Sequence, residues 1–159
     1  MFNKVSALSG VVVVAAMLSA CTSNESYTVM VNQVSPSGVG AELGTVTVSE
    51  ASGGGVQLTP NLYDLPPGEH GFRVHENPSC EPGSKNDVMQ AALAAGGALD
   101  DLPMLDVDDK GFATVPVVAK NLKLTDLKER SLVIHSGTAV IGNNTPEGAD
   151  SRIACGVIK

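Results

Sequence analysis

The chain contains no tryptophan, and aromatic residues make up only 3% of its 159 residues. A hydrophobic core therefore has to be built mainly from valine, leucine, isoleucine and alanine. Basic residues are also few, because ten Lys and Arg stand against 17 Asp and Glu. This balance argues against nucleic acid as a partner and against electrostatic attachment to a membrane surface.

The apolar run near the start is too short to span a bilayer comfortably, and it has the form of an export signal. Lys4 precedes the apolar residues 11–17, which are followed by Leu18-Ser19-Ala20-Cys21. Small residues before a cysteine form the cleavage pattern of bacterial lipoproteins. We therefore expect Cys21 to become a lipidated N-terminus. The alternative is an ordinary secretory signal with an incidental cysteine.

This pattern predicts a signal peptide over residues 1–20, a lipidated tether over 21–26 and one domain over 27–159. The mature chain would have 139 residues, with nine basic and 17 acidic side chains and a net charge near −8. Thr22 replaces the aspartate associated with retention in the inner membrane. We therefore expect a lipid anchor on the periplasmic side of the outer membrane, with the lipid rather than a basic patch holding the protein there.

Three cysteines leave one pair, Cys80 and Cys155, once Cys21 is assigned to the lipid. An exported chain enters an oxidising compartment, where such a pair is expected to form a disulfide. The two cysteines are 75 residues apart. Closing a loop of that order is worth roughly 4 kcal/mol in the chain-entropy model. The alternative is two free, buried thiols.

The rest of the pattern is mostly β. Alternating or β-branched segments are separated by glycine and proline turns, at residues 27–31, 43–48, 56–59, 112–119, 131–136 and 153–158. Seven or eight short strands of this kind favour a β-sandwich or a Greek-key barrel in a single domain. Two segments differ, because the Ala-rich residues 88–95 predict a short helix and residues 124–128 a single helical turn.

One strand has side chains with chemical interest on one face. Because successive side chains of a strand point to opposite faces, Phe72 and Val74 should face the core, and Arg73 and His75 should share the other face. A His-x-His pair on such a strand can chelate one metal ion. Here a guanidinium stands beside one imidazole.

Six segments, in order, resemble the copper–zinc superoxide dismutases, and most closely the bacterial periplasmic branch. They are residues 65–72, 77–80, 94–97 and 101–103, the run formed by 124–127 and 131–135, and residues 152–158. The resemblance implies an all-β fold, an eight-stranded Greek-key β-barrel flattened into a sandwich, with a shortened metal loop.

The resemblance also assigns the metal positions. In that family four histidines bind copper, and His75 and His135 stand at two of those positions. Arg73 stands at the third. Ala98 stands where the family has the histidine that bridges copper to zinc. The zinc loop is cut short, which leaves Asp101 as the one candidate zinc ligand.

Two further residues match functional positions of the family. His70 matches a structural histidine that bonds the backbone near the copper site. Arg152 matches the arginine that guides the superoxide anion to copper. Without copper, we expect Arg152 to be vestigial and to bond carbonyl groups or an acid. Residues 137–150, in place of a charged steering loop, hold one Glu, one Asp and no Lys.

These residues predict a protein that is not an enzyme. Two histidines cannot build a site of four imidazoles, and an arginine does not deprotonate to become a ligand. We therefore expect a superoxide dismutase-like lipoprotein with no resident cofactor, acting as a binding or structural module for a protein partner or a second copy. We also expect Arg73 to reach into the empty copper space and pair with Asp101, or failing that with another local carboxylate, replacing the metal.

Two alternatives stay open at this point. In the first, His75 and His135 hold one weakly bound copper ion, most readily Cu(I), for copper handling. In the second, the chain is an unorthodox superoxide dismutase that gains a metal or haem through a dimer contact.

Overall fold

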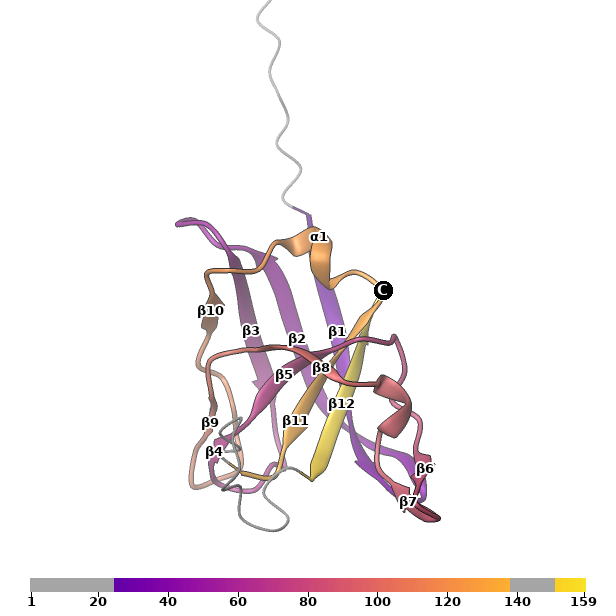
Figure 1. Cartoon of the computed structure of the whole chain (residues 1–159). Helices are drawn as coiled ribbons and strands as arrows, with labels where there is room; N and C mark the ends of the chain where they lie inside the picture. Colours follow the sequence, from indigo (N-terminus) through magenta and orange to yellow (C-terminus); the bar gives the residue numbers. More distant parts are fainter. Residues whose placement is uncertain (1–24, 138–150) are drawn as a thin grey trace, which may run out of the picture.

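The computed structural model describes residues 25–137 and 151–159 (Figure 1). The described elements follow one another along the chain as β1 (Ser26–Ser35), β2 (Gly38–Glu50), β3 (Val56–Leu62), β4 (Gly68–His70), β5 (Phe72–His75), β6 (Gly83–Lys85), β7 (Val88–Gln90), the 3-10 turn η1 (Leu93–Ala95), β8 (Ala98–Asp101), β9 (Leu105–Val107), β10 (Val117–Ala119), α1 (Leu124–Leu127), β11 (Arg130–His135) and β12 (Arg152–Ile158).

Eight strands form one sheet in the order β10-β3-β2-β1-β12-β11-β5-β8, with antiparallel neighbours. The sheet curls round on itself, so that β3, β2 and β1 stand behind β5, β8 and β11 (Figure 1). The last strand, β12, lies between β1 and β11 and joins the two layers. The predicted all-β, eight-stranded barrel or sandwich is confirmed.

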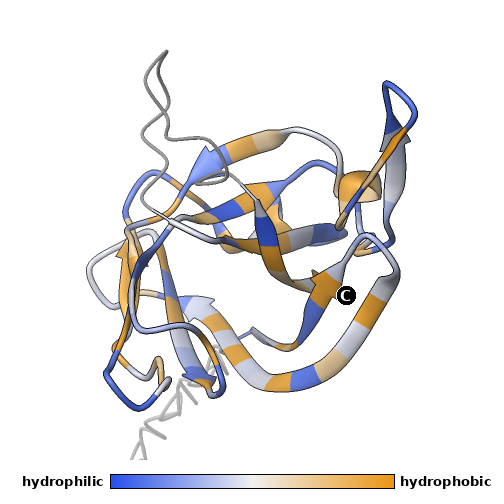
Figure 2. Ribbon diagram, turned by 90° about the horizontal axis from the view of Figure 1, so that it is seen from below, coloured by the Kyte–Doolittle hydropathy of each residue, from blue (hydrophilic) through white to orange (hydrophobic). Residues whose placement is uncertain are grey.

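The core lies between the two layers and is almost entirely aliphatic. Phe72 and Val74 of β5 belong to it, as predicted, and Phe72 is the only aromatic among the buried core residues that the structure describes. Hydrophobic and polar bands alternate along the strands (Figure 2). Burying each large aliphatic side chain contributes roughly 1.5–3 kcal/mol, so a core without tryptophan is sufficient here.

The predicted helix over residues 88–95 is wrong. This segment forms β7 and the short turn η1, and β7 pairs with β6 as a separate hairpin. Asn86 and Asp87 close that hairpin with φ of 53° and 61°, the backbone geometry that tight hairpin turns require. Strand 112–119 shrinks to β10, because Pro116 has no N–H to donate to a neighbouring strand. The helical turn at α1 is confirmed.

The predicted disulfide between Cys80 and Cys155 is present, with the Cα atoms 5.7 Å apart. It ties the loop that carries β6, β7 and η1 to β12. A small second cluster of buried residues surrounds the bridge, formed by Val34, Ala92, Ala95, Val133 and Cys155. The disulfide therefore holds the η1 segment over β11 and β12.

In the part of the chain that the structure describes, no helix is long and apolar enough to cross a membrane. Cys21 and most of the predicted tether lie outside the described residues.

The disulfide gives the first testable prediction. Replacing both Cys80 and Cys155 by serine should lower the free energy of unfolding by about 4 kcal/mol, because the unfolded chain is then no longer closed into a loop. Denaturant titration of the wild type and the double variant measures this. Thiol labelling of periplasmic protein before and after reduction provides the control, and two freely labelled thiols before reduction would contradict the bridge.

Candidate functional site

Strand β5 is paired on both sides, with β11 and with β8. Arg73 lies opposite Asp101, and His75 lies opposite Ala98 after a bulge in β8. Directly opposed residues of antiparallel strands share a face. Positions 73, 75, 98 and 101, which the resemblance assigns to metal ligands, therefore lie on the same face of the sheet, away from the core.

Two imidazoles meet on this face. His75 of β5 and His135 of β11 are both 1% exposed, and their Nε2 atoms are 3.4 Å apart. The rings are stacked, with their planes 19° apart. His75 Nδ1 lies 3.0 Å from the carbonyl oxygen of Gly96. Since that oxygen can only accept, Nδ1 is the protonated nitrogen, and the lone pair of His75 Nε2 faces His135.

The surroundings keep His75 neutral. Burial lowers the pKa of His75 from 6.5 to about 4, although the hydrogen bond to Gly96 opposes this shift. The positive charges of Arg152 and Arg73 and the neighbouring His135 lower the pKa further. Near neutral pH, His75 therefore presents an uncharged nitrogen at the centre of the site.

Arg73 forms the predicted ion pair. Its Nε donates to Asp101 Oδ1 at 2.7 Å, so this expectation is confirmed. The side chain of Arg73 is only 8% exposed, whereas that of Asp101 is 42% exposed. The pair links β5 to β8, and it engages an oxygen of the carboxylate that the resemblance offered as a zinc ligand.

The donor set does not fit a copper–zinc centre. The chain contains three histidines in all, and only His75 and His135 point at a common place. Ala98 brings no ligand, and the guanidinium of Arg73 would oppose a nearby cation. Among residues 25–137 and 151–159, no group of three or more His, Cys, Asp or Glu side chains could hold a metal ion.

Arg152 bonds the loop that the disulfide holds in place. Its NH1 donates to the carbonyl of Ala92, and its NH2 donates to the carbonyl of Gly96 at 2.8 Å. This agrees with the expected carbonyl-bonding position. The steering-loop residues 138–150 lie outside the described residues.

His70 supports the site from the side. It is 2% exposed, and its Nδ1 lies 2.8 Å from the carbonyl oxygen of His135. Its Nε2 lies 2.7 Å from the carbonyl oxygen of Pro66. His70, the expected structural histidine, thus links the backbone of β11 at His135 to the turn before β4.

The sequence did not reveal the importance of Gly96. Its carbonyl accepts from both His75 and Arg152. Its φ of +81° favours glycine, and an added Cβ would lie 2.7 Å from Glu76 Oε2. Glu76 in turn accepts from the N–H of Gly97. The only signal in the sequence was the pair Gly96-Gly97, and a glycine pair does not say which carbonyl will be used.

The ion pair gives a second prediction. Asp101→Ala should lower the free energy of unfolding by about 2 kcal/mol, because the guanidinium of Arg73 stays buried without its charge partner. Asp100→Ala is the matched control, since Asp100 is exposed on the same strand and pairs with Val74 on the other face. Denaturant unfolding of both variants measures the difference. Arg73→Ala should lower the free energy of unfolding by less than the loss of one partner from a fully buried ion pair does. The reason is that the remaining carboxylate of Asp101 is partly in water. Equal effects at positions 100 and 101 would contradict the role of the pair.

The lowered pKa of His75 gives a third prediction. The unfolded chain takes up a proton near pH 6.5, whereas the folded chain resists it down to about pH 4. The contribution of His75 to stability is therefore complete above pH 6.5 and is lost as the pH falls through this window. In His75→Gln, the free energy of unfolding should fall less steeply between pH 6.5 and pH 4 than in the wild type. Equal slopes of the free energy of unfolding against pH in the two proteins would contradict this role of His75.

Comparison with known proteins identifies the family of this fold. The family model of the copper/zinc superoxide dismutases matches residues 42–158. A relative from Salmonella typhimurium, "Superoxide dismutase [Cu-Zn] 2", is 42% identical over 155 residues, covering 82% of this chain and 87% of the relative. The solved copper–zinc superoxide dismutase of Brucella abortus superposes with a TM-score of 0.78 at 41% identity, covering 85% of this chain and all of that one. The monomeric enzyme of Salmonella enterica gives a TM-score of 0.77 at 41% identity, with the same coverage of both chains. The chain therefore belongs to the copper–zinc superoxide dismutase family.

Proposed function

We propose that this protein is a lipid-anchored member of the family, on the periplasmic side of the bacterial outer membrane, that has lost dismutase activity and serves as a binding or structural module. The observation that carries the proposal is the ion pair between Arg73 and Asp101. It joins two positions that the family resemblance assigns to metal ligands.

The chemistry of dismutation supports the proposal. The reaction needs a centre that cycles between two oxidation states, and no amino-acid side chain of this chain supplies one. The relatives are named as copper–zinc enzymes. Here two of the four copper positions hold Arg73 and Ala98. A guanidinium is always charged and donates hydrogen bonds only, so it repels a cation where the family has a ligand.

The anchor is supported by the sequence around Cys21, a short positive region, an apolar stretch and small residues before the cysteine. A lipidated barrel held at a membrane and freed from catalysis has its exposed loops available for contact with a protein partner.

One observation favours a second candidate function, which is copper handling. His75 Nε2 and His135 Nε2 lie 3.4 Å apart, and the Nδ1 of His75 is already satisfied by Gly96. A ring oriented in this way by its other nitrogen is the usual arrangement of a metal-binding histidine. Two imidazoles of this kind would suit a weakly held Cu(I) ion.

Copper loading under reducing conditions and superoxide decay test both candidates on one set of samples. The wild type should show no efficient dismutation. Arg73→His removes the opposing charge and adds a third imidazole, so the affinity for copper should rise by about tenfold or more. It should still not dismutate efficiently, because position 98 carries no histidine and the zinc loop is short. Activity should require a grafted loop as well.

His75→Gln is the control for copper handling. Copper that binds the wild type stoichiometrically, is lost in His75→Gln and brings no activity would favour copper handling over a metal-free module. Wild-type protein that dismutates superoxide near the diffusion limit when it carries copper would contradict the loss of activity and favour an unorthodox enzyme.

A further inference from the structure

We infer that the barrel stands end-on to the membrane, and that the end at which the chain enters β1 contacts anionic phospholipid headgroups through four exposed lysines, Lys120, Lys123, Lys128 and Lys159. This inference rests on the lipid anchor at Cys21 that is proposed above.

The segment after β10 brings two of the lysines to that end. Ala119, the last residue of β10, pairs with Val56 at the start of β3, so Lys120 follows beside the turn between β2 and β3. Lys123 directly precedes α1 and lines a cleft together with Glu50, the last residue of β2. The start of β1 lies beside the same turn, because Ser26 pairs with Ser49 of β2.

The other two lysines reach the same end by a different route. The N–H of Glu129 donates to the carbonyl of Ile158 at 3.1 Å, which places Lys128 and Lys159 on neighbouring segments. Figure 1 shows α1, the start of β1 and the last strand's C-terminal end together at one end of the barrel. All four lysines are exposed. Within the described residues, the salt bridge between Arg73 and Asp101 involves none of these lysines.

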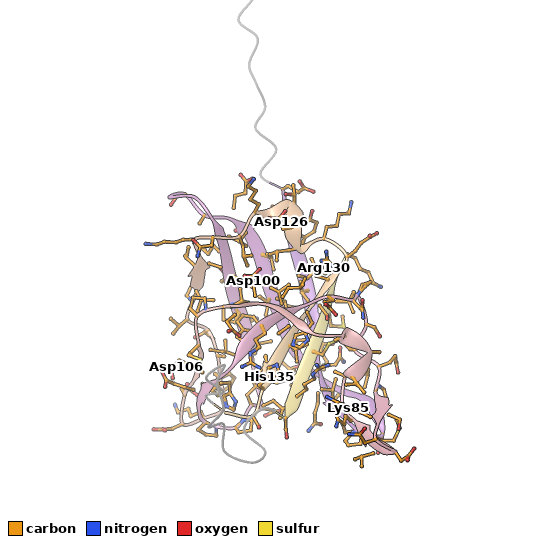
Figure 3. All side chains as sticks on the ribbon, in the orientation of Figure 1. Lys85, Asp100, Asp106, Asp126, Arg130 and His135 are labelled. Carbon is orange, nitrogen blue, oxygen red and sulfur yellow. A yellow bond between two sulfur atoms is a disulfide. The ribbon has the colours of Figure 1, made fainter. Side chains whose placement is uncertain are left out.

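The charges of the barrel are sorted between its ends. The end at the start of β1 is balanced, with five cations beside five acidic side chains: Lys120, Lys123, Lys128, Arg130 and Lys159 beside Glu25, Glu50, Asp100, Asp126 and Glu129. The end at β4 and β9 carries five acids against one cation: Asp64, Glu69, Asp106, Asp108 and Asp109 against Lys110. Figure 3 shows Asp126 and Arg130 towards the first end and Asp106 towards the second.

The two ends of this acidic molecule therefore interact differently with an anionic surface. The net charge of the chain, −7, disfavours attraction of the molecule as a whole. Strand β1 has ten residues and spans roughly 33 Å, several times the Debye length of about 8 Å in physiological salt. Acids at the far end are therefore screened from a membrane at the near end, and only the lysine end can approach closely.

The position of the proposed lipid anchor also favours contact of this end with the membrane. Ser26 follows Cys21 by five positions, and a chain of that length reaches at most about 18 Å. The lysine end thus stays close to the headgroups. Lysine ammonium groups sit on long, flexible stems, and they extend further than the shorter carboxylate side chains around them. Each lysine near an anionic surface favours contact over detachment by about fivefold.

Hydrogen exchange of the full, lipidated chain in nanodiscs tests the orientation. The probes are nanodiscs of phosphatidylcholine alone and of phosphatidylcholine mixed with phosphatidylglycerol. Amides of residues 120–128 should exchange about threefold more slowly, or more, in the anionic discs, and high salt should remove the difference. Amides of β4 and β9 should not respond.

Charge-reversal variants supply the matched comparison. Lys123→Glu with Lys128→Glu should abolish the slowing. Lys85→Glu with Lys110→Glu changes the net charge by the same amount at exposed positions away from this end, and should leave the slowing intact. Equal loss in both pairs would overturn the assignment of the contact to these lysines.

Mass spectrometry of the N-terminus separates the two ways of failing. A chain without lipid on Cys21 would overturn the proposed anchor, and the orientation with it. A lipidated chain that exchanges equally in both kinds of nanodisc would overturn the orientation alone.

Discussion

The pleat of β5 is the constraint on which the rest of the site depends. This strand is hydrogen-bonded to a neighbour on each side, so it can neither rotate nor slip without breaking two ladders. Its two-residue period places Phe72 and Val74 in the core and Arg73 and His75 on the opposite face. The contacts of Arg73 and His75 follow from that fixed division.

On this face hydrogen bonds join positions that the family resemblance assigns to metal ligands. A metal ion holds several ligands by strong bonds to one point, whereas Arg73 holds one carboxylate on β8 by a charge-assisted hydrogen bond. A second set of bonds converges on the carbonyl of Gly96, which accepts from His75 and Arg152. The loop that carries Gly96 is itself fastened by the disulfide. The face is thus well ordered by bonds within the protein, which is consistent with a proposed role that does not require a metal.

The distribution of charge says more than its total. The chain is acidic overall, and by composition alone it should avoid an anionic surface. The fold nevertheless collects most of its lysines beside α1 and the start of β1, and it collects uncompensated acids around β4 and β9. Screening separates the two ends electrostatically, because the strands between them are longer than the Debye length. The orientation proposed for the anchored protein depends on this sorting.

The sequence by itself determined the β class, the aliphatic core, the disulfide and the ion pair. Strand alternation, the number of cysteines and the ordered family segments are local signals, and they do not require knowledge of distant contacts. The pairing of Arg73 with Asp101 could be predicted because the resemblance places both residues at positions that hold metals in the family. The tertiary structure alone decided the conformation of residues 88–95, since helix propensity lost to the left-handed turn at Asn86 and Asp87 and to the disulfide that closes the loop. It also decided which carbonyl orients His75 and where the lysines gather, because both result from packing segments that are far apart in sequence, and no residue type or spacing records them.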